Sequence, residues 1–287
     1  MRLPADRIAA AFRNACLAEL QALKPGNVHV FAAGHRMTVE QFVRSADAAA
    51  APLAAPGARV GQRILDAVEA THAAVGANTN LGIILLCAPL AAAAETAPSD
   101  LRSALGDVLG ALDTEDAERA FRAIVRAAPA GLGRAERNDV FAPARVTLRQ
   151  AMTDAADRDR IARQYAAGYA DIFDRGLPLL AAAAARGWGA TSMALAVYLG
   201  FVAAFPDSHV VRKYSLAVAQ DVRNAAIKFH AALQAARDPA HLTDELLAWD
   251  AELKARGINP GTSADLTVAT LFVRELATIL PSERNSG

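Results

Sequence analysis

Apolar residues recur along most of this chain at intervals of three and four, the spacing of one helix face. The first such run, over residues 8–23, carries apolar residues at Ile8, Phe12, Ala15, Leu20 and Leu23. No series of strands and no internal repeat interrupts the pattern, so we predict an all-α fold in a single domain over residues 1–287. The predicted helices cover residues 8–23, 38–51, 61–75, 82–95, 100–112, 116–127, 147–174, 177–185, 192–205, 215–235, 244–256 and 263–280.

Two of the apolar segments have special patterns. Residues 82–95 are apolar on all sides, which predicts a central helix buried by the others. Residues 177–205 resemble a membrane span, but Arg186 and three glycines interrupt them, so a buried helix pair is the better interpretation. Thr38, with Gln41 three residues later, has the pattern of a capping box at a helix start.

Composition narrows the classes of function. The 287 residues are 53% hydrophobic with a net charge of +0, which provides a large core and gives no sign of a nucleic-acid surface. Cys16 and Cys87 are predicted to be reduced core residues. The first residues lack the apolar stretch of a signal peptide, so we expect a cytoplasmic protein with small-molecule partners. A homodimer is a possible assembly.

The turn KPGNVH after the first predicted helix concentrates polar groups. Lys24 suits a phosphate, Gly26 would let a ligand approach the backbone, and Asn27 adds an amide. His29, and His35 beyond it, could donate to anionic oxygens or transfer protons. Taken alone, the turn is slightly better interpreted as a helix stop, in which a lysine satisfies the last carbonyls.

A second polar segment, NTNLG, precedes the apolar helix 82–95. Asn78, Thr79 and Asn80 are all ordinary helix caps, but one helix rarely needs three of them. The start of this buried helix would suit an anion, so we predict that these residues bind ribose or phosphate.

A third segment, PDSHVVRKY, follows another apolar helix. Asp207 could ligate Mg²⁺ or act in catalysis, Arg212 and Lys213 could neutralise phosphates, and His209 is a second candidate acid or base after His29. The alternative is a solvated turn with local ion pairs.

The fourth segment, NPGTSAD, opens the last predicted helix. Gly261 and Ser263 offer N–H and hydroxyl groups for a phosphate, and Asp265 could hold a metal, as could Glu19 on the first helix. The alternatives are a capped helix start with a favourable acid in its first turn, and a solvated glutamate. The loop of residues 128–144 is long enough to be either functional or disordered.

The order of these segments resembles the triphosphoribosyl-dephospho-CoA synthase family. That family shows a PKPG-(L/N)-V segment, an NT-x-x-G segment before an apolar helix, a D-(T/S)-x-V-V-R segment and a (S/N)PGGSADL segment. Here they correspond to residues 24–28, 78–82, 207–212 and 259–266. Each motif is weak alone, but four in the right order are strong evidence for the family.

The resemblance implies an all-α, Mg²⁺-dependent transferase whose donor is ATP. A hydroxyl of dephospho-CoA attacks C1′ of the ATP ribose, adenine leaves, and the triphosphate stays on the transferred sugar. The four loops are then expected to converge on one pocket.

At some positions the sequence differs from that of the family members whose product becomes the prosthetic group of citrate and malonate decarboxylases. Those members read NTHKG where this chain has NTNLG, and they carry Asp where this chain has His29. The differences resemble a divergent branch found with tetrahydromethanopterin biosynthesis in archaea and methylotrophic bacteria. We therefore keep two acceptors, dephospho-CoA and a tetrahydromethanopterin precursor, and two donors, ATP and phosphoribosyl pyrophosphate. A non-catalytic nucleotide or cofactor-precursor binding protein is the alternative.

Overall fold

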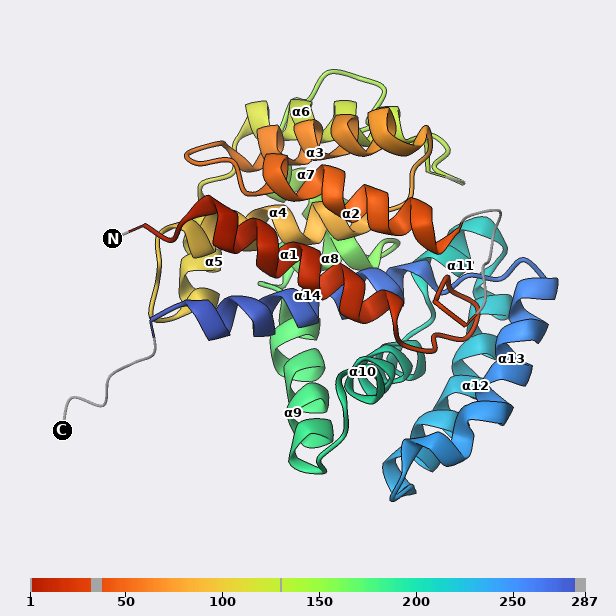
Figure 1. Cartoon of the computed structure of the whole chain (residues 1–287). Helices are drawn as coiled ribbons and strands as arrows, with labels where there is room; N and C mark the ends of the chain where they lie inside the picture. The colour runs from red at the N-terminus through yellow and green to blue at the C-terminus, as the bar shows by residue number, and fades with distance from the viewer. Residues whose placement is uncertain (1, 32–37, 130, 282–287) are drawn as a thin grey trace.

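The computed structural model describes residues 2–31, 38–129 and 131–281 of the chain, and in these ranges the regular elements are helices (Figure 1). The all-α prediction is confirmed. The α-helices are α1 Ala5–Leu20, α2 Val39–Leu53, α3 Val60–Val75, α4 Leu81–Glu95, α5 Leu101–Gly110, α6 Thr114–Ala127, α7 Leu148–Ala155, α8 Arg160–Ala166, α9 Leu177–Ala185, α10 Ala190–Ala204, α11 Ser208–Lys213, α12 Leu216–Ala235, α13 Thr243–Ala255 and α14 Gly261–Ile279. A π-helical turn, η1 Ile172–Gly176, and a 3₁₀ turn, η2 Pro239–Leu242, complete the set.

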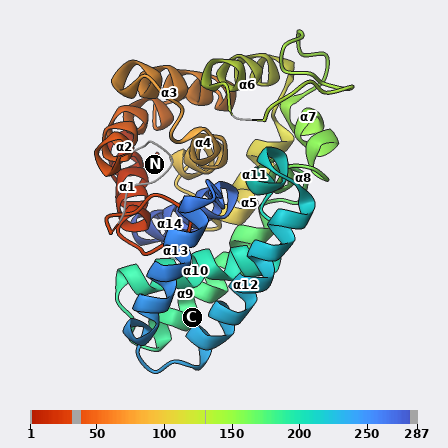
Figure 2. The same cartoon turned by 90° about the vertical axis from the view of Figure 1, so that its right-hand side faces the viewer.

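Helix α4 occupies the centre of the upper part of the molecule. Figure 2 looks along it, with α1, α2 and α3 to one side, α6 above and α14 below. Nearly all of its side chains are buried, as expected for a helix that is apolar all round. At its amino-terminal end, Gly82 lies against Asp265 of α14 and Ile161 of α8.

Helix α14 runs beside α1 through the middle of the fold. The rings of Phe12 and Phe272 meet edge to face with centroids 5.9 Å apart, an arrangement that adds to the burial of apolar area. Below them lie α9 and α10 (Figure 1). Helix α10 is buried as predicted, but α9 buries only Leu180 and Ala183, so the prediction of a buried helix pair is wrong for α9. No helix in the described part of the chain is long and apolar enough to cross a membrane.

The single helix predicted over residues 147–174 is wrong. Asp159 begins a new helix there, because its Oδ1 accepts hydrogen bonds from the backbone N–H groups of Ile161 and Ala162. Gly168 and Tyr169 then adopt positive φ angles of 59° and 60°, which a continuous helix cannot accommodate. The chain is thereby divided into α7, α8 and η1, and Asp159 lies at a helix start.

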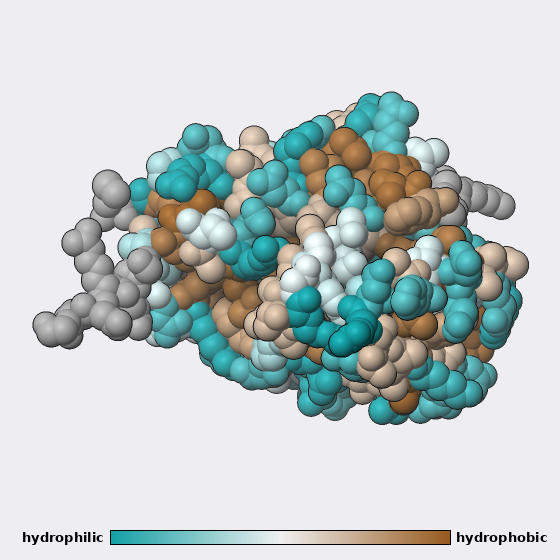
Figure 3. Space-filling model, turned by 60° about the horizontal axis from the view of Figure 1, so that its bottom comes forward, coloured by the Kyte–Doolittle hydropathy of each residue, from teal (hydrophilic) through white to brown (hydrophobic). Residues whose placement is uncertain are grey.

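Other local predictions are confirmed. Thr38 and Gln41 form the capping box of α2. Cys16 and Cys87 are free thiols on α1 and α4, and burial raises the pKa of both. On the face shown in Figure 3, hydrophilic side chains cover much of the surface and apolar ones appear in separate patches.

Candidate active site

A pocket of about 750 Å³ lies at the amino-terminal end of α4. Parts of all four polar segments reach it, although they are far apart in the sequence. The predicted site residues that line it are Glu19, Asn27, Asn78, Thr79, His209, Arg212, Lys213, Gly261 and Asp265. Six other predicted residues do not line it: Lys24, Gly26, His29, Asn80, Asp207 and Ser263.

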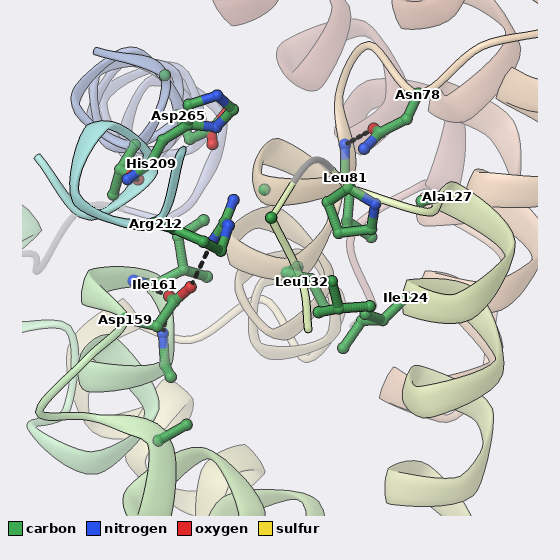
Figure 4. Close-up of a pocket in the computed structure, with 18 of the residues that line it drawn as sticks. Asn78, Leu81, Ile124, Ala127, Leu132, Asp159, Ile161, His209, Arg212 and Asp265 are labelled. Carbon is green, nitrogen blue, oxygen red and sulfur yellow. Dashed lines mark hydrogen bonds and ion pairs between the residues drawn. The ribbon is translucent and has the colours of Figure 1, made fainter. Parts of the chain in front are cut away.

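One wall of the pocket is polar and charged (Figure 4). His209 and Arg212 come from the short helix α11, and Asp265 comes from the first turns of α14. Nη1 of Arg212 lies 3.2 Å from Oδ2 of Asp159, the residue that caps α8. This wall therefore combines an imidazole, a guanidinium and carboxylates facing one space.

The opposite wall is largely apolar. Leu81 on α4, Ile124 on α6 and Leu132 in the long loop face the charged wall across the pocket (Figure 4). A pocket with one charged and one apolar wall suits a ligand that carries both phosphates and a ring.

Asp265 is the carboxylate whose surroundings are most unusual. Burial, together with the negative charges of Asp207, Glu19 and Asp159, raises its pKa well above the usual range, while Arg212 opposes this. A carboxylate whose ionised form is destabilised by burial and by nearby negative charges is a candidate for proton transfer or for binding a cation.

Asp207 occupies a different environment from the one predicted. It is 2% exposed and does not line the pocket. Oδ1 accepts from the N–H groups of His209 and Val210, at 2.9 and 3.3 Å, and Oδ2 accepts from the N–H and Oγ of Ser263, both at 2.8 Å. Burial raises its pKa, and these hydrogen bonds oppose the rise. The same bonds explain why Ser263, predicted to bind phosphate, faces Asp207.

Lys24 is a buried partner of Glu19. Its Nζ donates to Glu19 Oε1 and, at 3.0 Å, to Asn27 Oδ1. Burial raises the pKa of Glu19 and lowers that of Lys24, while their contact favours the charged pair. Asn27 also donates to Asn259 Oδ1 at 2.8 Å, which joins the first loop to the fourth. Lys24 was predicted to contact a phosphate. In the structure it lies behind Glu19 and pairs with this pocket residue instead.

Gly26 permits a close approach, but the approaching group is protein. A Cβ at this residue would lie 2.9 Å from Pro260 Cδ and 3.0 Å from Ile258 O, and φ is +82°. Its N–H donates to Asp250 Oδ1 at 2.8 Å. The glycine therefore brings the first and fourth loops together.

His29 is fully buried beside α13 and lies outside the pocket lining. Its Nε2 lies 3.3 Å from Asp250 Oδ1 and 3.3 Å from Lys254 Nζ, and burial lowers its pKa. This placement separates it from a bound substrate, whereas His209 lines the pocket. His35 falls outside the described residues.

The NTNLG segment attaches the start of α4 to α2. Asn78 Oδ1 accepts from the N–H of Leu81 at 3.1 Å, and Thr79 Oγ1 donates to Ser45 Oγ at 2.6 Å. Asn80 is 5% exposed, and its Nδ2 is 3.4 Å from the carbonyl of Ser45. Asn78 and Thr79 line the pocket, and Asn80 supports them from behind.

Lys213 lines the pocket, but its ammonium group is engaged elsewhere. Nζ donates to the carbonyl of Gly257 at 3.2 Å and lies 5.3 Å from the ring centroid of Tyr214. Arg212 is therefore better oriented for an anion in the pocket than its neighbour.

Two contributors to the pocket were not assigned to it from the sequence: the loop of residues 128–144, for which the sequence indicates either function or disorder, and Asp159. The loop of residues 128–144 supplies several lining residues, and a Cβ at Gly131 would lie 2.9 Å from the carbonyl of Arg212. Asp159 lay within the helix predicted over residues 147–174, so it was not recognised as a helix start. The length of the loop indicated a possible functional role, but no residue within it indicates its contact with α11.

The carboxylates fit a magnesium ion only in part. Within residues 2–31, 38–129 and 131–281, no group of three carboxylate, imidazole or thiol side chains is arranged to hold a metal ion. Mg²⁺ on a triphosphate needs only one or two protein carboxylates. Asp265 and Glu19 line the pocket and could serve, whereas both oxygens of Asp207 already accept hydrogen bonds.

Comparison with known proteins assigns the family. A crystal structure from Archaeoglobus fulgidus, provisionally named a triphosphoribosyl-dephospho-CoA synthase, aligns with a TM-score of 0.61 and 22% identity, over 82% of this chain and 97% of that one. No curated protein matches. The family model CitG, described as ATP:dephospho-CoA triphosphoribosyl transferase, matches residues 5–283. The chain therefore belongs to this family of phosphoribosyl-type transferases.

Proposed function

We propose that the pocket transfers a phosphorylated ribose from ATP to the hydroxyl group of an acceptor. The observation that carries this proposal is the meeting of His209, Arg212 and Asp265 on one wall, with an apolar wall opposite. A triphosphate would lie near Arg212, and a base or acceptor ring would lie against Leu81, Ile124 and Leu132.

The reaction requires one bond to form and one to break. The acceptor oxygen bonds to C1′ of the ribose as the bond from C1′ to adenine breaks, and adenine leaves with the electron pair. The acceptor hydroxyl loses a proton to a base, and adenine gains one. We assign the base to His209, because it lines the pocket and lies on the rigidly held α11.

Mg²⁺ would be held by Asp265, with Glu19 nearby, and would supply positive charge to the triphosphate. Arg212 contributes a fixed positive charge of its own. With phosphoribosyl pyrophosphate as donor, the same groups would face a pyrophosphate leaving group.

The acceptor is dephospho-CoA or a pterin precursor of tetrahydromethanopterin. Both present a hydroxyl for attack and a ring for an apolar wall. Two of the residues that differ from the decarboxylase-linked members lie at this wall, Leu81 on it and Asn80 just behind it, and we take this difference as support for the pterin precursor.

The test is a single-turnover incubation with each donor and each acceptor. We expect release of adenine from ATP, in equal amount to a ribosylated acceptor detected by mass spectrometry, and loss of release in Asp265→Asn. Arg102→Ala is the control, because Arg102 pairs with Asp174 outside the pocket. Nucleotide binding without release of adenine or pyrophosphate from any pair would contradict transfer and support a non-catalytic binding protein.

A further inference from the structure

One buried carboxylate joins the starts of two helices that carry the pocket residues. Asp207 accepts two hydrogen bonds from the first turn of α11 and two from Ser263 at the start of α14. The side chain is 2% exposed and does not line the pocket. Its oxygens therefore face protein donors and not a bound ligand.

A second set of hydrogen bonds also joins the start of α11 to the start of α14. Ser208 Oγ lies 3.0 Å from Thr262 Oγ1, and the N–H of His209 lies 3.2 Å from the same hydroxyl. The N–H of Arg160, at the start of α8, donates to Ser208 Oγ at 3.2 Å. Three helix starts are thus tied to each other through short polar side chains.

The residues beside these connections face the pocket. His209 follows Asp207 by two residues, and Asp265 follows Ser263 by two, so their separation depends on how α11 lies against α14. Helix α11 has only six residues and is too short to be fixed by its own hydrogen bonds. Contacts between α11 and α14 therefore set this separation, and Asp207 contributes to them by accepting two hydrogen bonds at each helix start.

We infer that Asp207 is a positioning residue, which holds His209 in register with Asp265 and contacts neither metal nor substrate. Its kinetic consequence rests on the proposed function, but the link between the helices does not. Asparagine at position 207 has nearly the same shape, yet it can offer acceptor oxygen to only one of the two helices.

The test compares Asp207→Asn with Asp100→Asn. Asp100 caps α5 by accepting from the N–H groups of Arg102 and Ser103, and it is exposed and outside the pocket. We expect kcat of Asp207→Asn to fall about 10- to 100-fold, as misplacement of reacting groups does. The Mg²⁺ concentration for half-maximal rate should stay close to that of the unchanged protein. Asp100→Asn keeps an acceptor oxygen for the same two N–H groups, so it should keep both stability and kcat.

Hydrogen exchange tests the link without any activity. Exchange should accelerate at the amides of Val210 and Ser263 in Asp207→Asn, and it should stay unchanged near residue 102 in Asp100→Asn, where the asparagine oxygen still caps α5. An unchanged kcat, a large shift in the Mg²⁺ requirement like that of Asp265→Asn, or unchanged exchange at residues 209–211 and 263 would overturn the inference. Should Asp207→Asn not fold, Ser263→Ala, which removes one hydroxyl donor, should lower kcat in the same way but less. An unchanged protein that transfers ribose to no acceptor contradicts the proposed function alone, since exchange still tests the link.

Discussion

The carboxylate of Asp265 lies directly against the backbone of Gly82 in the first turn of α4. A Cβ at Gly82 would be 2.0 Å from Oδ2 of Asp265 and 2.7 Å from Cδ1 of Ile161. The absence of a side chain at one residue therefore makes room for the acidic group of another, on a helix far away in the sequence.

Substitution Gly82→Ala should displace Asp265 and reduce transfer activity at least about tenfold, because reacting groups tolerate little misplacement. Alanine is otherwise favoured over glycine in helices by about 1 kcal/mol, so any loss comes from the clash. Initial rates and thermal unfolding measure the effect.

Gly106→Ala in α5 is the matched control. A Cβ there meets nothing within 4 Å, so this variant should gain about 0.5–1 kcal/mol and keep its activity. Activity of Gly82→Ala equal to that of Gly106→Ala would show that Asp265 has no part in the reaction.

The fold was largely predictable because, in a helical chain, the spacing of apolar residues within each segment already indicates which face of the helix is buried. The absence of polar residues from residues 82–94 was enough to place α4 at the centre. The interruption at Asp159 was not, because the apolar spacing continues through it and only its cap and the positive φ of Gly168 and Tyr169 divide the helix.

The lining of the pocket was predictable where polar residues directly precede or begin a helix, as with Asn78, His209 and Asp265. It was not predictable for Gly26 and His29. Their partner is Asp250 on α13, more than 220 residues later, and a turn in isolation cannot show whether its N–H and imidazole face a ligand or another helix.

Arg212 should determine the affinity for the donor. Removing a charge-assisted contact to phosphate costs about 1.5–3 kcal/mol, so Arg212→Ala should raise the donor KM by roughly 10- to 100-fold. Arg212→Lys keeps the charge but loses the fixed fork beside Asp159, and it should give an intermediate value. A KM unchanged in Arg212→Ala would place the phosphates elsewhere.

The buried pair of Lys24 and Glu19 should matter for stability. Lys24→Met leaves the Glu19 carboxylate buried without its partner, which costs about 3–5 kcal/mol. The double variant Lys24→Met, Glu19→Leu removes both charges and should recover most of this loss. Urea unfolding of the unchanged protein, the two single variants Lys24→Met and Glu19→Leu, and the double variant gives the coupling energy, and additive losses would contradict it.

His29 should make stability depend on pH. Burial lowers the pKa of His29 below its ordinary 6.5, so between the folded value and 6.5 the unfolded chain binds more protons than the folded one. The free energy of unfolding therefore rises with pH through this window, and stability is lost as pH falls through it. In His29→Gln this contribution should disappear, so the difference in unfolding free energy from the unchanged protein should vary between about pH 5 and 7.

His241→Gln, exposed in η2, is the comparison variant, measured by urea unfolding at each pH. A difference for His29→Gln that stays constant over this range would show that His29 takes up a proton equally in both states.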